Sequence, residues 1–334
     1  MFNNKSLLVT GATGTFGISF IEFVLKNFKP KRVEIFSRDE LKQFNMKYSF
    51  PEKKYKCLRY FIGDVRDLDR LKMATYGIDY LIHAAALKQV ESSEYNPLEC
   101  IKTNIHGAEN VIESCLHNNV KKVIALSTDK AVNPLNFYGT TKLVSDKLFV
   151  AANNFYGKKE TRFSVVRYGN VANSRGSIIP FFKSLMTKSN YFPVTDKEMT
   201  RFWITKNHAV NFVLDSFNRM HGGEIFVPKL KSFKIIDLCK ALDMEKKIKF
   251  IGIKPGEKIH EALAAPEELS NTIEFKDFYS VIPSYNLNIP KKRYFISKKG
   301  EKGKIVLKTL NYSSGNKNFL IKLKDIKKLL STSL

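Results

Sequence analysis

The chain has 334 residues, of which 43% are apolar and 26% charged, and this length suffices for one large domain with its own core and a smaller partner. Its formal net charge is +24, but it has no run of about 18 apolar residues and no signal-like N-terminus, so we expect a cytoplasmic protein without a membrane span. The four cysteines form no CxxC pair and the six histidines form no ligand cluster, which predicts reduced core thiols and no metal site.

Short apolar runs that suit strands buried on both faces recur along the first half of the chain. They lie at 6–10, 32–36, 57–63, 79–83, 122–127 and 162–168. Between them, apolar residues recur at helical spacing in 17–28, 98–117 and 138–156. Strands that alternate with helices predict an α/β fold, with a Rossmann-like, doubly wound parallel sheet and right-handed crossovers.

The alternation of strands and helices breaks down after about residue 171, where short elements and many loops follow. We therefore predict a dinucleotide-binding Rossmann domain over 1–170, to which parts of 205–245 return. Residues 171–334 are predicted to form mainly a smaller, substrate-binding lobe and a basic C-terminal tail.

A glycine-rich turn, GATGTFG at 11–17, follows the first strand and opens the first helix. Glycines at positions 11, 14 and 17 permit a tight turn, backbone amides aimed at a pyrophosphate, and close packing of helix on strand. Such a triplet is weak by itself, but after the first strand of a βαβ pattern it predicts a dinucleotide site.

The end of the second strand selects the cofactor. An enzyme that prefers NAD usually carries an acidic residue there, whereas this chain has Phe36-Ser37-Arg38, and its acids, Asp39 and Glu40, come later. A guanidinium matches a 2′-phosphate, so NADP is predicted. The alternative is that Arg38 only caps a solvent-exposed loop.

A Tyr-x-x-x-Lys pair, Tyr138 and Lys142, follows the fifth strand and the turn Thr128-Asp129-Lys130. A spacing of four places both side chains on one face of a helix. The Lys142 ammonium and a nicotinamide cation are expected to lower the pKa of Tyr138, so that its phenolate can accept a proton from a sugar hydroxyl.

Nearly half of the excess charge lies in residues 281–334, where 13 Lys and Arg face 2 acidic residues. Binding of nucleic acid or of a membrane surface is one interpretation, and a lysine-rich composition that also steers anionic substrates is the other. The tail lacks the interleaved aromatics of a single-strand-binding surface, so no nucleic-acid partner is predicted.

At this point the sequence resembles a known family, the inverting UDP-N-acetylglucosamine 4,6-dehydratases that begin pseudaminic acid synthesis, within the extended short-chain dehydrogenase/reductases. The resemblance covers nearly the whole chain. It rests on SRDELKQ (37–43), FIGDVRD (61–67), IHAAALK (82–88), EYNPLECIKTNI (94–105), ALSTDKA (125–131), SDKLFVAANN (145–154), RYGNV (167–171), SRGS (174–177), MTRFWIT (199–205), RMHGGEIFVPK (219–229) and PGEKIHE (255–261).

The resemblance implies three sets of site residues. The catalytic set is Thr128, Asp129, Lys130, Tyr138 and Lys142. The NADP-binding set is Gly11, Thr13, Gly14, Thr15, Phe16, Gly17, Ser37, Arg38, Asp39, Glu40, Leu41, Lys42, Gln43, Asp64, Val65, Ala84, Lys88, Tyr138 and Lys142. The UDP-sugar-binding set is Lys88, Ser127, Thr128, Tyr138, Asn170, Val171, Arg175, Gly176, Ser177, Ile178, Ile179, Arg201, Lys254 and Glu257.

The resemblance also implies a reaction. Tyr138 takes the 4-hydroxyl proton as carbon 4 is oxidised, Lys130 removes the acidified proton of carbon 5, and Asp129 protonates the departing 6-hydroxyl. Hydride then returns to carbon 6, and carbon 5 is reprotonated from its other face, giving UDP-2-acetamido-2,6-dideoxy-β-L-arabino-hex-4-ulose. A lysine that acts as a base must be neutral, so a lowered pKa is expected for Lys130, produced by burial beside Lys142 and the nicotinamide. The alternative role of Lys130 is that of a structural ion-pair partner of Asp129.

Three departures from the family pattern concern substrate contacts. Lys254 stands where the family usually has Arg, Gln89-Val90-Glu91 where it usually has His-Val-Pro, and Asn173 where it usually has Gly. Rival functions are a UDP-hexose 4-epimerase or a 5-retaining dehydratase of the same fold, and, from another class, a non-catalytic NADP-binding scaffold. Helices 98–117 and 138–156 resemble the dimer-forming pair of this superfamily, which predicts a homo-oligomer of even subunit number.

Overall fold

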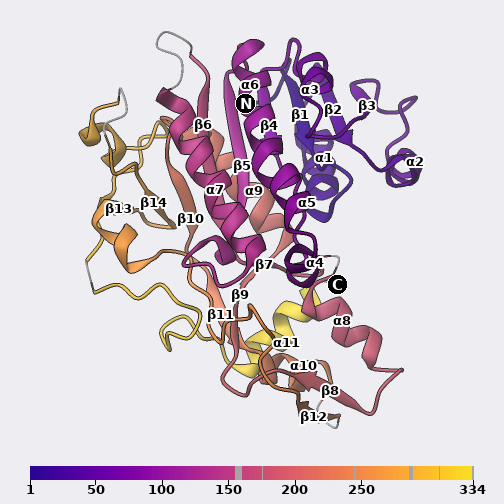
Figure 1. Ribbon diagram of the computed structural model, residues 1–334, viewed down its shortest axis with the longest axis vertical. Helices are drawn as coiled ribbons and strands as arrows, with labels where there is room; N and C mark the ends of the chain where they lie inside the picture. Colours follow the sequence, from indigo (N-terminus) through magenta and orange to yellow (C-terminus); the bar gives the residue numbers. More distant parts are fainter. Residues whose placement is uncertain (155–159, 175, 244–245, 286–288, 308, 333–334) are drawn as a thin grey trace.

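The computed structural model of the protein shows a large α/β body with a smaller lobe below it (Figure 1). It describes residues 1–154, 160–174, 176–243, 246–285, 289–307 and 309–332. Ten strands form one sheet in the order β15-β13-β14-β10-β6-β5-β4-β1-β2-β3. Seven consecutive strands of this sheet, from β10 to β3, run parallel, which confirms the predicted fold class.

All six predicted strands are present and their burial explains the apolar runs. They are β1 (Ser6–Thr10), β2 (Arg32–Ser37), β3 (Leu58–Ile62), β4 (Tyr80–His83), β5 (Lys122–Thr128) and β6 (Arg162–Tyr168). From β1, the strands β2 and β3 are added on one side and β4, β5 and β6 on the other. The connections after β1 and β4 therefore run in opposite directions, which opens a crevice at the carboxyl ends of these two strands.

Strands from later in the chain extend the same sheet. These are β10 (Ile225–Pro228), β13 (Thr272–Glu274), β14 (Phe278–Val281) and β15 (Lys304–Ile305). Strand β14 is antiparallel to β10, and β13 and β15 continue antiparallel to the sheet edge. The large sheet therefore draws on residues well beyond 171.

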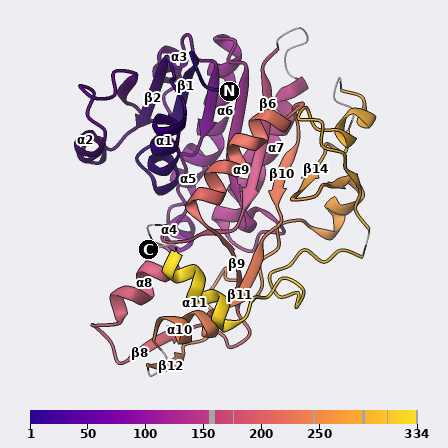
Figure 2. The ribbon, with the colours of Figure 1, turned by 180° about the vertical axis from the view of Figure 1, so that it is seen from behind.

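Helices cover both faces of the sheet. Figures 1 and 2 show α6 (Gly107–His117) and α7 (Phe137–Ala151) on one face and α9 (Lys206–Arg219) on the other, where α9 contacts α1 (Thr15–Asn27). The remaining helices of this body are α2 (Glu40–Ser49), α3 (Leu68–Ala74), α4 (Val90–Tyr95) and α5 (Pro97–Ile101), with short 3-10 turns at Ala152–Asn154, Pro266–Asn271 and Lys291–Phe295.

The predicted helix over 98–117 is interrupted by a π-helical turn at Lys102–His106, which separates α5 from α6. This wider turn directs the buried Asn104 side chain at the backbone of Leu87, to which it donates at 2.9 Å and from which it accepts at 2.9 Å. Asn104 also donates to Thr141 Oγ1 on α7 at 3.0 Å. The interruption thus ties the loop after β4 to α7. The predicted helix over 138–156 is confirmed by α7 and the 3-10 turn after it, and its last residues, 155–156, lie outside the described residues.

The smaller lobe has its own sheets and core. It contains β7 (Asn170–Val171), β9 (Thr200–Ile204) and β11 (Lys231–Lys234) in one sheet, β8 (Tyr191–Val194) and β12 (Lys247–Phe250) in another, and the helices α8 (Ile178–Leu185), α10 (Ile235–Leu242) and α11 (Leu323–Thr332). Apolar side chains of α8, β8, α10 and α11 form its core, with Phe182, Phe192 and Leu238 completely or almost completely buried.

The basic C-terminal segment is folded onto both parts of the molecule. Tyr312 is buried and its hydroxyl donates to the carbonyl of Pro228 at the end of β10, while α11 packs on α10 (Figure 2). The described part of this segment therefore packs against both parts of the molecule and contributes to the fold.

Candidate active site

The carboxyl ends of the parallel strands open onto one cavity of about 1000 Å³. The cavity lies between the large sheet and the smaller lobe, because residues of the loops after β1 to β6 and residues of α8, β8 and β9 all line it. This is the place where doubly wound sheets bind their ligands.

The glycine-rich turn after β1 forms one wall of the cavity. Gly11 has a φ of +63°, and a Cβ atom there would lie 2.8 Å from the Ala84 carbonyl oxygen. A Cβ atom at Gly17 would lie 2.4 Å from the Ala12 carbonyl oxygen. Both positions therefore require glycine, and the close approach leaves the N-terminus of α1 facing the cavity. A helix N-terminus with free backbone amides fits a pyrophosphate.

The end of β2 presents an arginine at the cavity rim. Arg38 is half exposed, and its Nη1 lies 3.6 Å from Asp64 Oδ2. Beneath it, the buried Gln43 side chain donates to the carbonyls of Ser37 at 3.0 Å and Phe61 at 2.8 Å. Asp39 caps α2 by accepting from the Lys42 backbone amide. The guanidinium is thus anchored beside the cavity yet open to an anionic group.

Most of the predicted NADP-binding residues are brought together by the fold. Those that line the cavity are Gly11, Thr13, Gly14, Thr15, Phe16, Gly17, Ser37, Arg38, Asp39, Lys42, Asp64, Val65, Ala84, Lys88, Tyr138 and Lys142. Glu40 and Leu41 instead point to solvent on α2, and Gln43 acts from below the cavity floor through its hydrogen bonds to Ser37.

The predicted catalytic residues lie on two elements in close contact. Strand β5 ends at Thr128, and Asp129–Ala131 forms a 3-10 turn. A Cβ atom at Gly139 would lie 2.2 Å from the Lys130 carbonyl oxygen, so only glycine lets α7 approach this turn. The neighbouring residue, Tyr138, lines the same cavity as Asp129 and Lys130.

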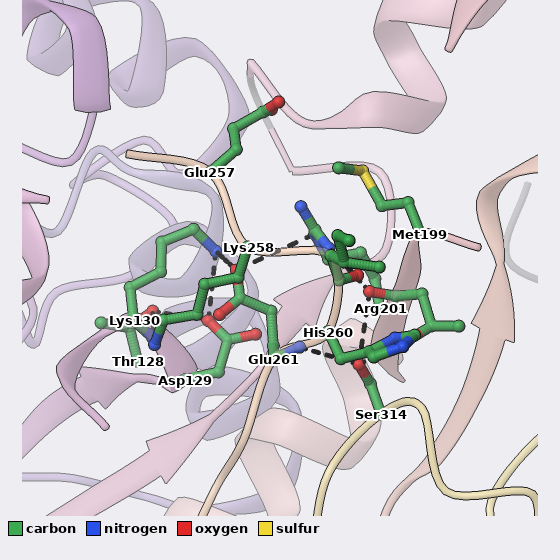
Figure 3. Close-up of polar contacts among 12 residues, drawn as sticks. Thr128, Asp129, Lys130, Met199, Arg201, Glu257, Lys258, His260, Glu261 and Ser314 are labelled. Carbon is green, nitrogen blue, oxygen red and sulfur yellow. Dashed lines mark hydrogen bonds and ion pairs between the residues drawn. The ribbon is translucent and has the colours of Figure 1, made fainter. Parts of the chain in front are cut away.

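Lys130 lies between two carboxylates (Figure 3). Its Nζ is 3.2 Å from Asp129 Oδ1 and 3.2 Å from Glu261 Oε1, on a distant segment of the chain. Both carboxylates are almost completely buried, whereas the Lys130 side chain is 23% exposed towards the cavity. The Thr128 hydroxyl donates to Asp129 Oδ1 at 3.0 Å.

The expected lowering of the Lys130 pKa is wrong. Burial lowers the pKa of Lys130, but the negative charges of Asp129 and Glu261 outweigh it and hold the pKa above its usual value. The sequence prediction considered neighbouring cations, while the nearest charges are carboxylates. The Tyr138 pKa is also not lowered by the protein as expected: burial raises it to about 12, although the Lys130 charge and a Thr128 hydrogen bond act in the opposite direction. The pKa of the buried Lys142 is lowered, chiefly by desolvation.

Most of the predicted UDP-sugar-binding residues line the same cavity. Those that line it are Lys88, Ser127, Thr128, Tyr138, Asn170, Val171, Gly176, Ser177, Ile178, Arg201, Lys254 and Glu257. Ile179 does not line it, because the side chain is buried in the core of the smaller lobe. Arg175 lies outside the described residues.

Two of the three departures from the family pattern contact each other. Lys254 Nζ lies 2.8 Å from Glu91 Oε1, across the rim of the cavity. The pair is exposed and so contributes little to stability. The third departure, Asn173, has a φ of +55°, a left-handed conformation that glycine and asparagine both tolerate. The replacements at these positions therefore fit the local backbone and charge.

Comparison with known proteins places this geometry in a family. The family model described as polysaccharide biosynthesis protein matches residues 7–283. The chain belongs to this polysaccharide biosynthesis protein family. It is 55% identical over 317 residues to a UDP-N-acetylglucosamine 4,6-dehydratase (inverting) from Campylobacter jejuni, covering 95% of this chain and 94% of that one. The resemblance found in the sequence is confirmed.

Other relatives of this chain carry a different name. A UDP-glucose 4-epimerase from Rickettsia massiliae is 41% identical over 339 residues, covering 99% of this chain and 97% of that one. Among solved structures, Pen from Bacillus thuringiensis has a TM-score of 0.89 at 35% identity and covers 99% of this chain and 98% of its own. Relatives that align along nearly the whole chain are thus named for two different reactions.

Glu261 lines the cavity and is a site residue that sequence reasoning missed. It belongs to the PGEKIHE stretch, from which only Glu257 was assigned to the site. The stretch contains two glutamates, Glu257 and Glu261, so a second candidate carboxylate was visible in the sequence. The spacing of the stretch does not show that Glu261 contacts Lys130. His83 is buried against Thr10, and Trp203 packs on Phe233, so both residues have structural contacts.

Two further findings concern only the described residues. Among them, no helix combines the length and apolar character needed to cross a membrane. In the same part of the chain, no three His, Cys, Asp or Glu side chains are grouped to hold a metal ion.

Proposed function

We propose that this protein is an NADP-dependent UDP-N-acetylglucosamine 4,6-dehydratase that inverts carbon 5, the first step of pseudaminic acid or related surface-glycan synthesis. The observation that carries the proposal is the placement of Asp129 and Lys130 in one cavity with Tyr138 and the glycine-rich turn. The 55% identity to the dehydratase from Campylobacter jejuni supports the same reaction.

The residues present fit a nicotinamide dinucleotide. The turn at Gly11–Gly17 leaves no room for a Cβ atom at two positions, and Arg38 stands at the rim beside it. Such a cofactor, when bound, supplies reversible hydride transfer. Arg38 is proposed to hold the 2′-phosphate of NADP, and the N-terminus of α1 the pyrophosphate.

The reaction then follows from the protein's own groups. Tyr138, beside Thr128 and Lys130, accepts the proton of the sugar 4-hydroxyl, and oxidation at carbon 4 makes the neighbouring C5–H bond acidic. Lys130 removes the carbon-5 proton. Burial and the charge of Glu261 raise the pKa of Asp129, which favours this carboxyl as the group that gives a proton to the departing 6-hydroxyl. The UDP diphosphate is proposed to lie on the basic side of the cavity, which includes Arg201 and Lys88.

A second candidate function is a UDP-hexose 4-epimerase, because relatives of that name align along nearly the whole chain. An epimerase uses the Tyr–Lys pair and the cofactor but eliminates no water. It therefore does not need an acid–base pair at positions 129 and 130. Incubation of the purified protein with UDP-N-acetylglucosamine, followed by mass spectrometry, separates the two. We expect a product lighter than the substrate by one water, whereas a product of unchanged mass would support the epimerase.

Replacement of Arg38 tests the choice of cofactor. Arg38→Ala should weaken NADP binding by about tenfold or more, because a charge-assisted contact to the 2′-phosphate is lost. Binding of NAD to the same variant, measured by calorimetry, serves as the internal control and should change little. Equal weakening for both cofactors, or for neither, would remove the role proposed for Arg38.

A homo-oligomer of even subunit number is proposed to form through the face that carries α4, α5 and α7. Exposed apolar side chains on these helices support this, among them Tyr95, Leu98 and Val144. Large exposed apolar side chains on neighbouring helices are typical of subunit interfaces.

A further inference from the structure

Glu261 and Asp129 contact Lys130 in the same way. Each carboxylate directs one oxygen at Lys130 Nζ, at 3.2 Å in both cases. The other oxygen of each, Asp129 Oδ2 and Glu261 Oε2, is buried and has no hydrogen-bond partner among the described residues. A buried carboxylate oxygen without a partner is costly, so two of them beside one ammonium indicate a group that exchanges protons.

The position of Glu261 is fixed from behind by the C-terminal segment. Its backbone N–H donates to Ser314 Oγ at 2.9 Å, and its carbonyl accepts from the Ser314 backbone N–H at 2.7 Å. Ser314 Oγ lies 2.7 Å from Thr200 Oγ1, which lies 2.8 Å from His260 Nδ1. Ser314 and Thr200 are almost completely buried, so this network holds the Glu261 backbone rigidly beside the cavity.

We propose that Glu261 is a positioning residue of the acid–base group, which holds the Lys130 ammonium and takes up its proton so that Lys130 can act as the base at carbon 5. The proposal rests on the dehydratase function proposed above. It adds a third member to the pair predicted from the sequence.

The proton transfers balance over one turnover. An N–H bond of Lys130 breaks and an O–H bond forms on Glu261. The Lys130 amine then takes the carbon-5 proton, the C–H electron pair forms the C5=C6 double bond, and the C6–O bond breaks with a proton from Asp129, which releases water. When hydride returns to carbon 6, a proton returns to carbon 5. The proton that Tyr138 took from the 4-hydroxyl replaces the one that Asp129 gave to water, so the protein ends as it began.

The charges around the two carboxylates differ, which separates their roles. Glu261 lies near Lys130, Arg201 and Lys258, and these cations outweigh burial and hold its pKa below the usual value. Burial raises the pKa of Asp129, and the Glu261 charge raises it further. Environments that push two carboxyl pKa values apart assign the acid and the base. The raised pKa favours Asp129 as the proton donor, and the lowered pKa favours Glu261 as the carboxylate that faces Lys130.

Other groups also face Lys130 from the packed elements. Tyr138 on α7 and Arg201 on β9 both affect its charge, and Lys130 in turn lowers the pKa of Lys88. These groups are unchanged in a variant in which only Glu261 is replaced. A shift in the pH dependence of kcat in that variant is therefore caused by the loss of Glu261.

The test is Glu261→Gln, which keeps the shape and removes the charge and the proton-accepting oxygen. Loss of the negative charge lowers the pKa values of both Lys130 and Asp129, so the whole profile of kcat against pH should move to lower pH by about 1 unit or more. The variant should also lose kcat on the order of 10²-fold, with KM changed less than about threefold, because Glu261 acts through Lys130. Glu267→Gln, an exposed carboxylate on the following turn, is the matched control and should behave as wild type.

The outcomes separate this inference from the proposed function. Wild-type protein that releases no water from UDP-N-acetylglucosamine would overturn the dehydratase function and the inference with it. Wild-type turnover together with an unshifted profile and kcat within about twofold in Glu261→Gln would overturn the role of Glu261 alone. If that variant does not fold, Glu261→Asp decides: it keeps the charge at a shorter reach, so we expect a lower kcat at the wild-type pH optimum, and an unchanged kcat would contradict the proposal.

Discussion

Two buried clusters in this protein each hold one cation between two carboxylates, and they differ in the cation. In the first, Arg167 on β6 contacts Asp146 Oδ2 at 3.5 Å and Glu268 Oε2 at 2.8 Å. In the second, Lys130 lies 3.2 Å from both Asp129 and Glu261. The Arg167 side chain is completely buried, while that of Lys130 reaches the cavity.

The comparison shows how one arrangement of charges serves structure in one place and chemistry in another. A guanidinium keeps its proton at any ordinary pH and donates in a fixed fork, as Arg167 does to both oxygens of Glu268. An ammonium is a point charge that can lose its proton when its surroundings change. The first cluster therefore joins β6, α7 and the turn at Pro266–Asn271, whereas the second can exchange protons with a ligand in the cavity.

Lys130→Arg is the substitution with the largest expected effect, since it makes the second cluster resemble the first. The charge stays, so we expect the protein to remain folded and to bind NADP. The guanidinium cannot act as a base, so the release of water should fall by about 10³-fold or more. Product mass spectrometry measures the loss, with cofactor binding as the control. Activity within tenfold of wild type would show that Lys130 is only an ion-pair partner of Asp129.

Arg167→Leu should destabilise the fold instead of acting on the chemistry. It leaves Asp146 and Glu268 buried without their cation, and breaking such a buried pair costs about 3–5 kcal/mol. Urea denaturation followed by circular dichroism measures the loss, and Arg167→Lys, which keeps the charge, should lose less. A loss below about 1 kcal/mol would mean that the first cluster does not stabilise the large body.

Glu268→Gln should give the smallest effect, one that depends on pH. Burial alone would raise the pKa of Glu268, but Arg167 outweighs it and holds the pKa below 4.5. The stabilisation is therefore fully present above the ordinary carboxyl range and is lost as the pH falls through the lowered value. We expect wild type to exceed the variant by about 1.5–3 kcal/mol at pH 7 and by progressively less below pH 4.5. A difference that does not change with pH would contradict this account.

The part of the molecule that could be predicted from the sequence is the part built from local patterns. The inner parallel strands, such as β1, are continuous apolar runs because they are buried on both faces, whereas the edge strand β3 is largely exposed. The turn at Gly11–Gly17 needs glycine where the backbone meets Ala84 and Ala12. Tyr138 and Lys142 are four positions apart, about one turn of α7. Such features depend on residues that are close together in the sequence.

The remainder depends on contacts between distant segments. Glu261 meets Lys130 only because β9 and the C-terminal segment hold it there. Its charge adds to that of Asp129, and together they reverse the expected direction of the Lys130 pKa. The π-helical turn at Lys102–His106 similarly follows from the contacts of Asn104 with Leu87 and Thr141. No local spacing encodes either contact.

The most direct test of the central claim is turnover of UDP-N-acetylglucosamine by the wild-type protein in D₂O, with the product examined by NMR. A lysine that removes and returns the carbon-5 proton while exchanging with solvent predicts a 4-keto product that carries deuterium at carbon 5, with inverted configuration there. A product that keeps the original hydrogen at carbon 5, or that differs from the substrate only at carbon 4, would contradict it.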